Sequence, residues 1–464
     1  MKPNLIFVCA DQLRYQSMGY ADDAKAQTPV LDALATKSVN LVNAVSGHPV
    51  CAPFRATLFT GKYTTSTGMV INEIRMNTNH RTFADVLNDS GYNTSYIGKW
   101  HMYAAELGDH YNPKNSFIPP GRDRLGFNGF FAAYNFHHDF YGEKAYYHLD
   151  TPEKIYCEGY EPDAQTDIAI DQIKSLAGKD KPFALFLNVG TPHDPWTPDN
   201  VPPEYLERFK DTEFKLPENY LPENDPRADN WAKFKPGERE ELTEWMRVYY
   251  AMTANLDWNM GRLLAAIDEL DDNTIVVFTS DHGELFGAHG RRAKNIFYEE
   301  AVRVPFLVRQ GGLTPRTCDV CFNTVDIMPT LLGMMGLPVP AEVEGQDLTA
   351  VLKGEKDTDD GSLMMGTGPT AVFGDGYEWR AYRTKQFTYG VFKSDGKELL
   401  FDHVNDPMQM KNLADDAAYA GIFTELKSRM WAEMDRIGDR FELNSYYKEN
   451  WIEDRVIMRT ATIG

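Results

Sequence analysis

The feature of the sequence that most constrains the fold is a series of short, unbroken apolar runs separated by stretches with helical periodicity. The clearest runs cover residues 5–8, 94–97, 183–187, 275–278 and 305–308. Such runs are typical of strands covered on both faces, as in a parallel sheet packed between helices. The sequence therefore predicts an α/β fold with a large, mostly parallel sheet flanked by helices.

The pattern changes toward the carboxyl end of the chain. Before the change, Thr28 and Pro29 predict a helix start, and residues 241–270 have the periodicity of one long helix. After a polar stretch from Gly354, strand patterns cover residues 371–373, 379–383, 387–392 and 398–402, and a helical pattern covers 422–437. We predict a large α/β domain over residues 1–353 and a small α+β domain with an antiparallel sheet over residues 354–464.

The charge of the chain limits its partners. With 47 Lys and Arg against 68 Asp and Glu, the 464 residues carry a formal net charge of −21. Nothing in the sequence resembles a basic stripe, so neither nucleic acid nor an anionic membrane is expected as a partner. No apolar run reaches the roughly 18 residues needed to cross a bilayer. An anionic substrate would therefore need a local cluster of cations or a bound metal.

The five cysteines are too few and too scattered for a disulfide framework in a chain of this length. Cys318 and Cys321 have the spacing of a redox or zinc pair, but no second ligand pair accompanies them, and we expect a structural role. The first residues lead directly into an apolar strand without signal-peptide features. We expect a cytoplasmic protein for the chain as given, or a periplasmic or secreted one if a leader was removed.

Polar residues suited to metal or anion chemistry follow four of the predicted strands. In chain order they are Asp11 with Gln12, Lys99 with His101, His193 with Asp194, and Asp281 with His282. Ligand sites in open α/β sheets form outside the carboxyl ends of the strands, so these side chains should converge. Taken singly, Asp11 and Asp281 would be loop acids that cap the following helix. Together with an amide and one imidazole, they favour a hard divalent cation such as calcium or magnesium.

The stretch that begins at Cys51 predicts a helix ending at Gly61. Pro53 is tolerated in the first turn, and Arg55 lies one turn beyond Cys51 on the same face. The free N–H groups of a helix amino terminus favour negative charge. An isolated cysteine here would more often be a small buried residue, but Arg55 makes Cys51 a candidate reactive group for an anionic substrate.

Three motifs resemble, in the same order, the signatures of the type I (formylglycine-dependent) sulfatases of the alkaline phosphatase superfamily. They are Cys51-Ala-Pro-Phe-Arg55 with its extension to Tyr63, Gly98-Lys-Trp-His101, and Ser280-Asp-His-Gly-Glu284 with Lys294 and residues 298–305 downstream. The resemblance covers nearly the whole chain and is nearest to bacterial carbohydrate sulfatases. It implies that a formylglycine-generating maturation enzyme oxidises Cys51 to an aldehyde.

The resemblance also implies a metal site and a reaction. In the sulfatases, the residues corresponding to Asp11, Gln12, Asp281 and His282 bind calcium together with the formylglycine derived from Cys51. Many members have Asp-Asp and Asp-Asn where this chain has Asp-Gln and Asp-His, so the charge differs but the ligand count does not. The implied reaction is hydrolysis of a sulfate monoester.

The roles of the remaining site residues follow from the same resemblance. Asp281 would act as the base for the formylglycine hydrate, and His193 would protonate the departing alcohol. The sulfate oxygens would be held by Arg55, Lys99, His101 and Lys294. His101 would also take up the proton when the aldehyde is regenerated.

The substrate region is predicted from composition and from the same similarity. Residues 117–150 are rich in aromatic side chains and include His137 and His138. They are interpreted either as a sugar-stacking wall of the pocket or as an insertion packed on the body of the fold. Other candidate contacts are Asn72, Asp375 and Arg380. The similarity favours a sulfated hexosamine or hexose as substrate, while the oligomeric state is not specified by the sequence.

Two other functions fit parts of the sequence. A phosphonate or phosphate diester hydrolase of the same superfamily would share the formylglycine, the Asp-Gln pair and an asparagine at the position of Asn72. The motif from Lys99 to His101 favours sulfate over this alternative. A non-catalytic binding protein would keep Cys51 as a plain thiol.

Overall fold

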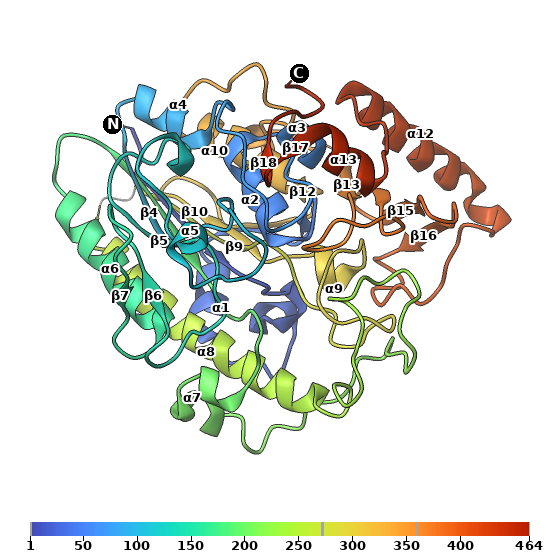
Figure 1. The fold of residues 1–464 in the computed structure, drawn as a ribbon, viewed down its shortest axis with the longest axis horizontal. Coiled ribbons are helices and arrows are strands. Elements are labelled where there is room, and N and C mark those ends of the chain that lie inside the picture. Colours follow the sequence, from blue (N-terminus) through green and yellow to red (C-terminus); the bar gives the residue numbers. More distant parts are fainter. Residues whose placement is uncertain (1, 271–272, 359–360, 464) are drawn as a thin grey trace.

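The predicted apolar runs form the middle of an eight-stranded sheet in the computed structural model, which describes residues 2–270, 273–358 and 361–463 (Figure 1). Across the sheet the strands are β11 (Arg316–Cys318), β2 (Val39–Leu41), β10 (Phe306–Arg309), β9 (Ile275–Ser280), β1 (Leu5–Ala10), β8 (Phe183–Val189), β4 (Asn93–Lys99) and β5 (Phe131–Tyr134). The predicted α/β class is therefore confirmed, and β1 lies near the centre of the sheet.

Most neighbouring strands are parallel, as predicted, but one of the five apolar runs is reversed. β1 pairs in parallel with both β8 and β9, and β4 pairs in parallel with β8 and β5. β10, which the apolar pattern assigned to the parallel set, is antiparallel to β9 and β2. An unbroken apolar run reports burial on both faces and carries no information about strand direction, so this detail was wrong.

Helices cover both faces of the sheet, and the side chains of β1 divide between them. Leu5, Phe7 and Cys9 face the core beneath α2 (Cys51–Thr60), α4 (Phe83–Asp89) and α10 (Thr324–Met334). Ile6, Val8 and Ala10 face the core beneath α1 (Pro29–Ala35), α6 (Glu161–Leu176) and α8 (Leu242–Ile267). The predicted helices beginning near residues 29 and 241 are thus α1 and α8.

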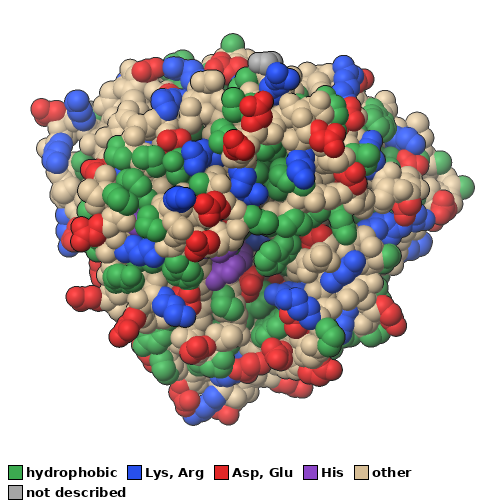
Figure 2. All heavy atoms as spheres, in the orientation of Figure 1, with side chains coloured by type: hydrophobic (Ala, Val, Ile, Leu, Met, Phe, Trp, Pro, Cys, Tyr) green, Lys and Arg blue, Asp and Glu red, His purple; other side chains and the backbone are tan. Residues whose placement is uncertain are grey.

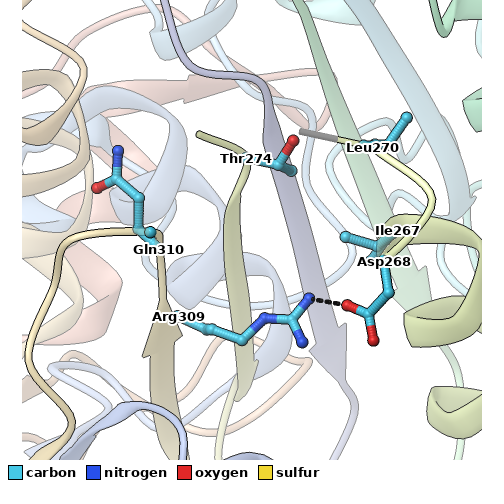
Figure 3. A pocket seen from close by; sticks show the side chains of 7 residues that line it. Ile267, Asp268, Leu270, Thr274, Arg309 and Gln310 are labelled. Carbon is cyan, nitrogen blue, oxygen red and sulfur yellow. Dashed lines mark hydrogen bonds and ion pairs between the residues drawn. The ribbon is translucent and has the colours of Figure 1, made fainter. Parts of the chain in front are cut away.

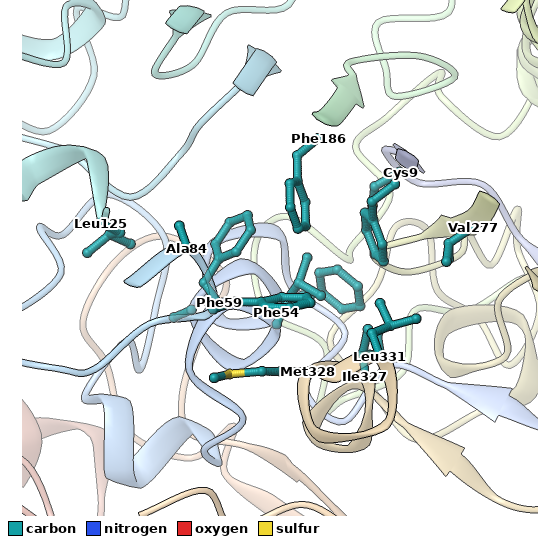
Figure 4. Close-up of a cluster of buried hydrophobic side chains, with 14 of the residues drawn as sticks. Cys9, Phe54, Phe59, Ala84, Leu125, Phe186, Val277, Ile327, Met328 and Leu331 are labelled. Atoms are coloured by element: carbon teal, nitrogen blue, oxygen red, sulfur yellow. The ribbon is translucent and has the colours of Figure 1, made fainter. Parts of the chain in front are cut away.

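The helix that begins at Cys51 is enclosed by the fold. All ten residues of α2 are buried, and the helix lies between the sheet and α10 (Figure 4). Phe59 contacts Phe186 of β8 with 5.7 Å between ring centroids. Burying a phenylalanine side chain stabilises a fold by roughly 1.5–3 kcal/mol, so such contacts fix the helix firmly. They also fix its amino end, where Cys51 lies.

The carboxyl-terminal part contains the predicted antiparallel sheet, drawn in orange and red in Figure 1. Its strands are β13 (Ser362–Gly366), β14 (Trp379–Arg383), β15 (Phe387–Phe392) and β16 (Glu398–Asp402), covered by α12 (Ala420–Arg436). The strand predicted at residues 371–373 is wrong: that segment is a loop, and the first strand is β13. Ala371 and Val372 of this loop line a cavity described below, and Phe373 packs against the core that contains α2.

The end of the chain returns to the large sheet. Tyr447 and Trp451 of α13 (Asn444–Trp451) and Ile457 of β18 (Val456–Ile457) join the core that contains α2. The division of the chain near residue 354 therefore stays a proposal, and Asp359 and Asp360 of the predicted linker lie outside the described residues. Among the described residues, no helix combines the length and apolar character that a membrane span requires. All five cysteines are free thiols and buried.

Arg380 on β14, a candidate substrate contact from the sequence, lies inside this carboxyl-terminal part instead. Its side chain is fully buried, with Nε 2.5 Å from Oδ2 of Asp439 and Nη2 2.9 Å from Oδ1. Nη1 also donates to the carbonyl oxygen of Gly366 at 2.9 Å. A buried guanidinium needs such a full set of acceptors, so Arg380 has a structural role.

This arrangement predicts a stability effect without an effect on substrate choice. We expect Arg380→Met to lower the free energy of unfolding by about 3–5 kcal/mol, because Asp439 is left buried without its partner. The double variant Arg380→Met/Asp439→Leu should recover much of this loss. Urea unfolding of the three proteins measures both effects, and a single variant as stable as the parent would contradict the structural role.

Candidate active site

The polar residues that follow the strands converge on the amino end of α2, as the sequence predicted. The thiol Sγ of Cys51 lies 3.0 Å from Nζ of Lys294, 3.2 Å from Nε2 of His282 and 3.8 Å from Nζ of Lys99. Oδ1 of Asp11 lies 3.7 Å from the same sulfur. Cys51 is therefore enclosed by three cationic or imidazole groups and one carboxylate.

The backbone around the site adopts conformations that local sequence preferences disfavour. Gln12 and His101 have left-handed φ values of 67° and 58°. Gly98, with φ of 99°, allows a close approach, since a Cβ atom there would lie 2.1 Å from the carbonyl oxygen of Asn188. This contact explains why the motif that presents Lys99 and His101 begins with glycine.

Two buried carboxylates form the floor of the site, and cations separate them. Asp11 Oδ2 lies 2.6 Å from Nζ of Lys99 and 3.3 Å from Nη2 of Arg55. Asp281 Oδ2 lies 3.6 Å from the same Arg55 nitrogen. Although burial opposes it, the neighbouring cations, first Lys99, hold the pKa of Asp11 well below its usual range. Burial and the charge of Asp11 raise the pKa of Asp281 to about 7.

The guanidinium of Arg55 donates its hydrogen bonds to acceptors other than the thiol of Cys51, among them Oδ2 of Asp11. Its Nη1 also donates to the carbonyl oxygen of Lys99 at 2.8 Å and to Oδ1 of Asn188 at 2.9 Å. Arg55 Nη2 pairs with the acids that surround Cys51, and its assignment to the substrate oxygens stays a prediction.

The thiol of Cys51 is a poor nucleophile in this environment. Burial and the charge of Asp11 raise the pKa of Cys51 to about 11, against the opposing effect of Lys294 and Lys99. The thiol is therefore protonated near neutral pH. The favourable effect expected from the helix amino end and Arg55 does not overcome burial.

Four groups could hold a metal ion. Ligand atoms of Asp11, Cys51, Asp281 and His282 all lie within 4.8 Å of one another. Oδ2 of Asp281 is buried and has no hydrogen-bond partner among the described residues, which is the condition expected of an unused ligand atom. Gln12 lies beside them with Oε1 3.5 Å from Nζ of Lys294. This oxygen-rich donor set fits a hard divalent cation.

His193 lies on the outer side of the cluster. Its Nε2 is 3.1 Å from Nζ of Lys294, and its Nδ1 is 2.8 Å from the carbonyl oxygen of Asp194. Burial and the charge of Lys294 lower the pKa of His193 to about 4. His101 is also buried, stacks on Phe136 with 4.2 Å between ring centroids, and has no hydrogen-bond partner among the described residues for either ring nitrogen.

A cavity of about 480 Å³ leads from this cluster to the surface. His193 and Lys294 line its inner end, and histidine side chains are visible in a depression near the centre of the face in Figure 2. Its volume is within the roughly 300–1,000 Å³ typical of small-molecule sites. A second cavity, of about 370 Å³, lies where Asp268 and Arg309 form an ion pair of 2.8 Å (Figure 3). None of the predicted site residues lines it.

The predicted substrate contacts divide into two groups. Asn72 and His138 line the larger cavity, while His137, Asp375 and Arg380 do not. The ring of His137 is buried 3.0 Å from Oε2 of Glu161, and the carboxylate of Asp375 accepts hydrogen bonds from Ser445. The aromatic segment 117–150 mostly packs on the body of the fold.

Several cavity residues were missed in the sequence. They are Glu73, His110, Trp231, Lys235 and Arg292. These residues lie on loops without a motif, whereas Asp194 was named beside His193 and Phe136 lies in the predicted aromatic segment. Trp231, with 53% of its surface exposed, is an unusually accessible aromatic side chain in this cavity.

Together, the mostly parallel sheet and the cluster at its carboxyl edge define the class, an α/β protein with the alkaline phosphatase-like fold. The Sulfatase family matches residues 3–337, and the family described as N-sulphoglucosamine sulphohydrolase, C-terminal, matches residues 287–436. The chain belongs to the sulfatase family, and it is a sulfuric ester hydrolase.

Individual relatives support this membership. The ulvan-active sulfatase of Formosa agariphila is 36% identical over 97% of this chain and 84% of that protein. The N-acetylglucosamine-6-O-sulfatase of Bacteroides thetaiotaomicron is 26% identical over 92% of this chain and 85% of that protein. A solved structure described as a sulfatase, yidJ, from Bacteroides fragilis has a TM-score of 0.82 at 31% identity, over 96% of this chain and 98% of that chain.

The acid cluster predicts that a divalent cation stabilises the fold. Saturating Ca²⁺ added to metal-free protein should raise the Tm by roughly 2–5 °C, because it binds only the folded state and offsets two adjacent carboxylates. Asp281→Asn should lose most of this rise. Asp375→Asn, which removes a carboxylate outside the cluster, should keep it. Differential scanning calorimetry measures the shift, and an equal rise in Asp281→Asn would place the cation elsewhere.

Proposed function

We propose that this chain hydrolyses the sulfate ester of a sulfated hexosamine or hexose, through a formylglycine made from Cys51 and with a calcium ion at the acid cluster. The observation that carries the proposal is the placement of Lys294 and Lys99, 3.0 and 3.8 Å from the sulfur of Cys51, at the inner end of a cavity open to a small ligand. These ammonium groups offer charge and donors to the oxygens of a sulfate.

The calcium ion and the formylglycine that this proposal requires fit the residues around them. Asp11, Gln12, Asp281 and His282 would hold the calcium ion. When bound, calcium would neutralise the carboxylates and polarise the nucleophilic oxygen that formylglycine supplies in place of the thiol. The protonated thiol of Cys51, with a pKa of about 11, supports the need for this oxidation by the maturation enzyme.

The chain's own residues then have distinct tasks. Lys99 and Lys294 neutralise the sulfate and spread the charge that develops during the reaction. Arg55 holds Asp11 and Asp281 in place from behind. Asp281 is placed to accept a proton near Cys51, and the neutral, unpartnered His101 fits the proton acceptor of the later step.

His193 is suited to give a proton to the departing alcohol. Its Nε2 faces Lys294, and its Nδ1 is held by the carbonyl oxygen of Asp194 at 2.8 Å. Burial and the charge of Lys294 disfavour the protonated ring in the free enzyme and lower the pKa of His193. A bound sulfate offsets that charge and so favours protonation of His193 where the leaving group needs it.

A carbohydrate substrate is supported by the cavity wall and by the relatives. Trp231 presents an exposed ring, and Phe136 lies near the inner end, so a sugar can stack on an aromatic face. Two relatives are named as sulfatases of ulvan and of N-acetylglucosamine. The asparagine that pointed to phosphonates has another role, since Oδ1 of Asn72 accepts a hydrogen bond from the backbone N–H of Ala52 at 3.0 Å.

The proposal is tested by comparing esters of the same leaving group. We expect the matured enzyme to hydrolyse para-nitrophenyl sulfate with a kcat/KM at least about tenfold above that for para-nitrophenyl phenylphosphonate, because the motif from Lys99 to His101 favours sulfate. A panel of position-defined monosulfated hexoses and hexosamines should contain better substrates still. Preference for the phosphonate would overturn the assignment.

The state of Cys51 provides the control for that comparison. The mass of the Cys51 peptide should show the aldehyde or its hydrate in active preparations, and Cys51→Ala should be inactive. Full activity with an unmodified thiol would contradict the proposed nucleophile. Full occupancy by thiol without any turnover would favour the non-catalytic binding protein.

The role of His193 predicts an effect that depends on the leaving group. His193→Ala should lower kcat/KM on a sugar sulfate by about a hundredfold to ten-thousandfold, since a sugar alkoxide departs poorly without a proton. On para-nitrophenyl sulfate, whose leaving group needs no proton, the loss should stay below about tenfold. Equal losses on both substrates would exclude His193 as the proton donor and indicate a binding role.

A further inference from the structure

A carboxylate in the wall of the cavity has no place in the reaction described so far. Glu73 lines the cavity next to Asn72, and only 6% of its surface is exposed. The nearest groups to Oε1 are Nε2 of His101 at 3.6 Å and Nδ1 of His110 at 3.9 Å. Both distances exceed a hydrogen bond, and no described residue donates one to this carboxylate.

The segment that carries Glu73 is fixed on both sides. The backbone N–H of Asn72 donates to the carbonyl oxygen of Thr370 at 2.9 Å, and that of Arg75 donates to Arg455 at 2.7 Å. The guanidinium of Arg455 donates to the carbonyl oxygen of Glu73 itself. Glu73 also has a left-handed φ of 62°, a conformation that the surrounding contacts maintain. Its side chain is therefore held toward the cavity at little further cost in entropy.

The position of Glu73 relates it to the sulfate. Lys99 lies 4.6 Å from the ring centroid of Phe136, on which His101 also stacks, and His101 separates this ring from Glu73. His110 contacts the same ring from its edge, with 4.4 Å between centroids. The contacts from Lys99 to Glu73 thus run through Phe136 and His101, so Glu73 lies in the cavity wall two side chains away from a cation proposed to hold the sulfate.

A carboxylate with no donor from the described residues takes its hydrogen bonds from water in the cavity or from a bound substrate. Burial raises the pKa of Glu73 to about 7, against the opposing charges of Arg455 and Lys99. Hydroxyl or N–H groups of a sugar would satisfy the carboxylate oxygens on binding. A second sulfate or a carboxylate at the same place would meet repulsion and a lost hydrogen bond.

We propose that Glu73 selects the substrate by accepting hydrogen bonds from donors on the ring that carries the scissile sulfate, and by rejecting a second anionic group on that ring. The inference rests on the proposed sulfatase function and narrows it to singly sulfated sugars with free hydroxyl or amide N–H neighbours. Glu73 contacts the substrate without taking part in proton transfer.

Three probes test the inference with Glu73→Gln and Glu73→Ala. They are N-acetylglucosamine 6-sulfate, N-sulfoglucosamine 6-sulfate, which adds a second anion to the same ring, and para-nitrophenyl sulfate, which has no ring donors. Losing hydrogen bonds to a charged acceptor should lower kcat/KM on the first probe by about tenfold to a hundredfold. The loss on para-nitrophenyl sulfate should be clearly smaller, because this probe has no ring donors, and an unchanged Tm verifies that both variants fold.

The ratio of kcat/KM between the disulfated and the monosulfated sugar is the sharper readout. Glu73→Gln should raise the ratio of kcat/KM for the disulfated over the monosulfated probe by about tenfold, since one repulsive charge is removed. The matched control is Glu106→Gln, which removes the same charge at a side chain that is 49% exposed and outside the cavity lining. It should leave the ratio unchanged.

These measurements distinguish a wrong role for Glu73 from a wrong assignment of the sulfatase function. If the wild-type enzyme hydrolyses no sulfate ester, the proposed function fails. If it hydrolyses para-nitrophenyl sulfate but neither sugar probe, or if Glu73→Gln keeps the wild-type ratio, the selective role is overturned while the sulfatase function stands. Equal losses on all three probes would assign Glu73 to the reaction itself through His101.

Discussion

The repulsion between two buried carboxylates, Asp11 and Asp281, is the constraint around which the rest of the site is arranged. β1 and β9 pair in parallel and in register, with Ala10 opposite Ser280, so the residues that follow them are forced side by side. Two adjacent buried charges of one sign are tolerated only with compensation. Lys99 and Arg55 supply part of it, and the donor set leaves room for a cation to supply the rest.

The burial of the site explains why the cysteine itself is unsuited to the reaction. Burial and the charge of Asp11 raise the pKa of Cys51 by more than the charges of Lys294 and Lys99 lower it, so the thiol stays protonated. The charge of Lys294, 3.0 Å from the sulfur, lowers the pKa of Cys51 but does not bring it near neutral pH. The site is consistent with an oxygen nucleophile whose charge is shared with a metal, and inconsistent with simple thiolate chemistry.

The sequence predicted the residues near the strands better than those on the loops. Asp11, Lys99, His193 and Asp281 follow apolar runs directly, and strand geometry alone brings such positions together. The direction of β10 depends on a connection that the apolar pattern does not encode. Arg380 looked like a substrate contact because a lone arginine in a strand gives no sign of its partner, Asp439, 59 residues away. Glu73 and Trp231 lie in segments positioned only by tertiary contacts.

The net charge of the chain and the carboxylate of Glu73 both disfavour additional anionic groups on a substrate. A mean field from a charge of −21 repels every anion, and the repulsion grows with the number of sulfates on the substrate. Lys99 and Lys294 offset it for one sulfate, because they lie within a few ångströms of the reacting atom, where screening by salt is weak. The cavity wall carries Lys235 and Arg292 as well as Glu73 and Asp194. The net charge of the chain and the proposed role of Glu73 are therefore the grounds on which a sparsely sulfated sugar is proposed as substrate.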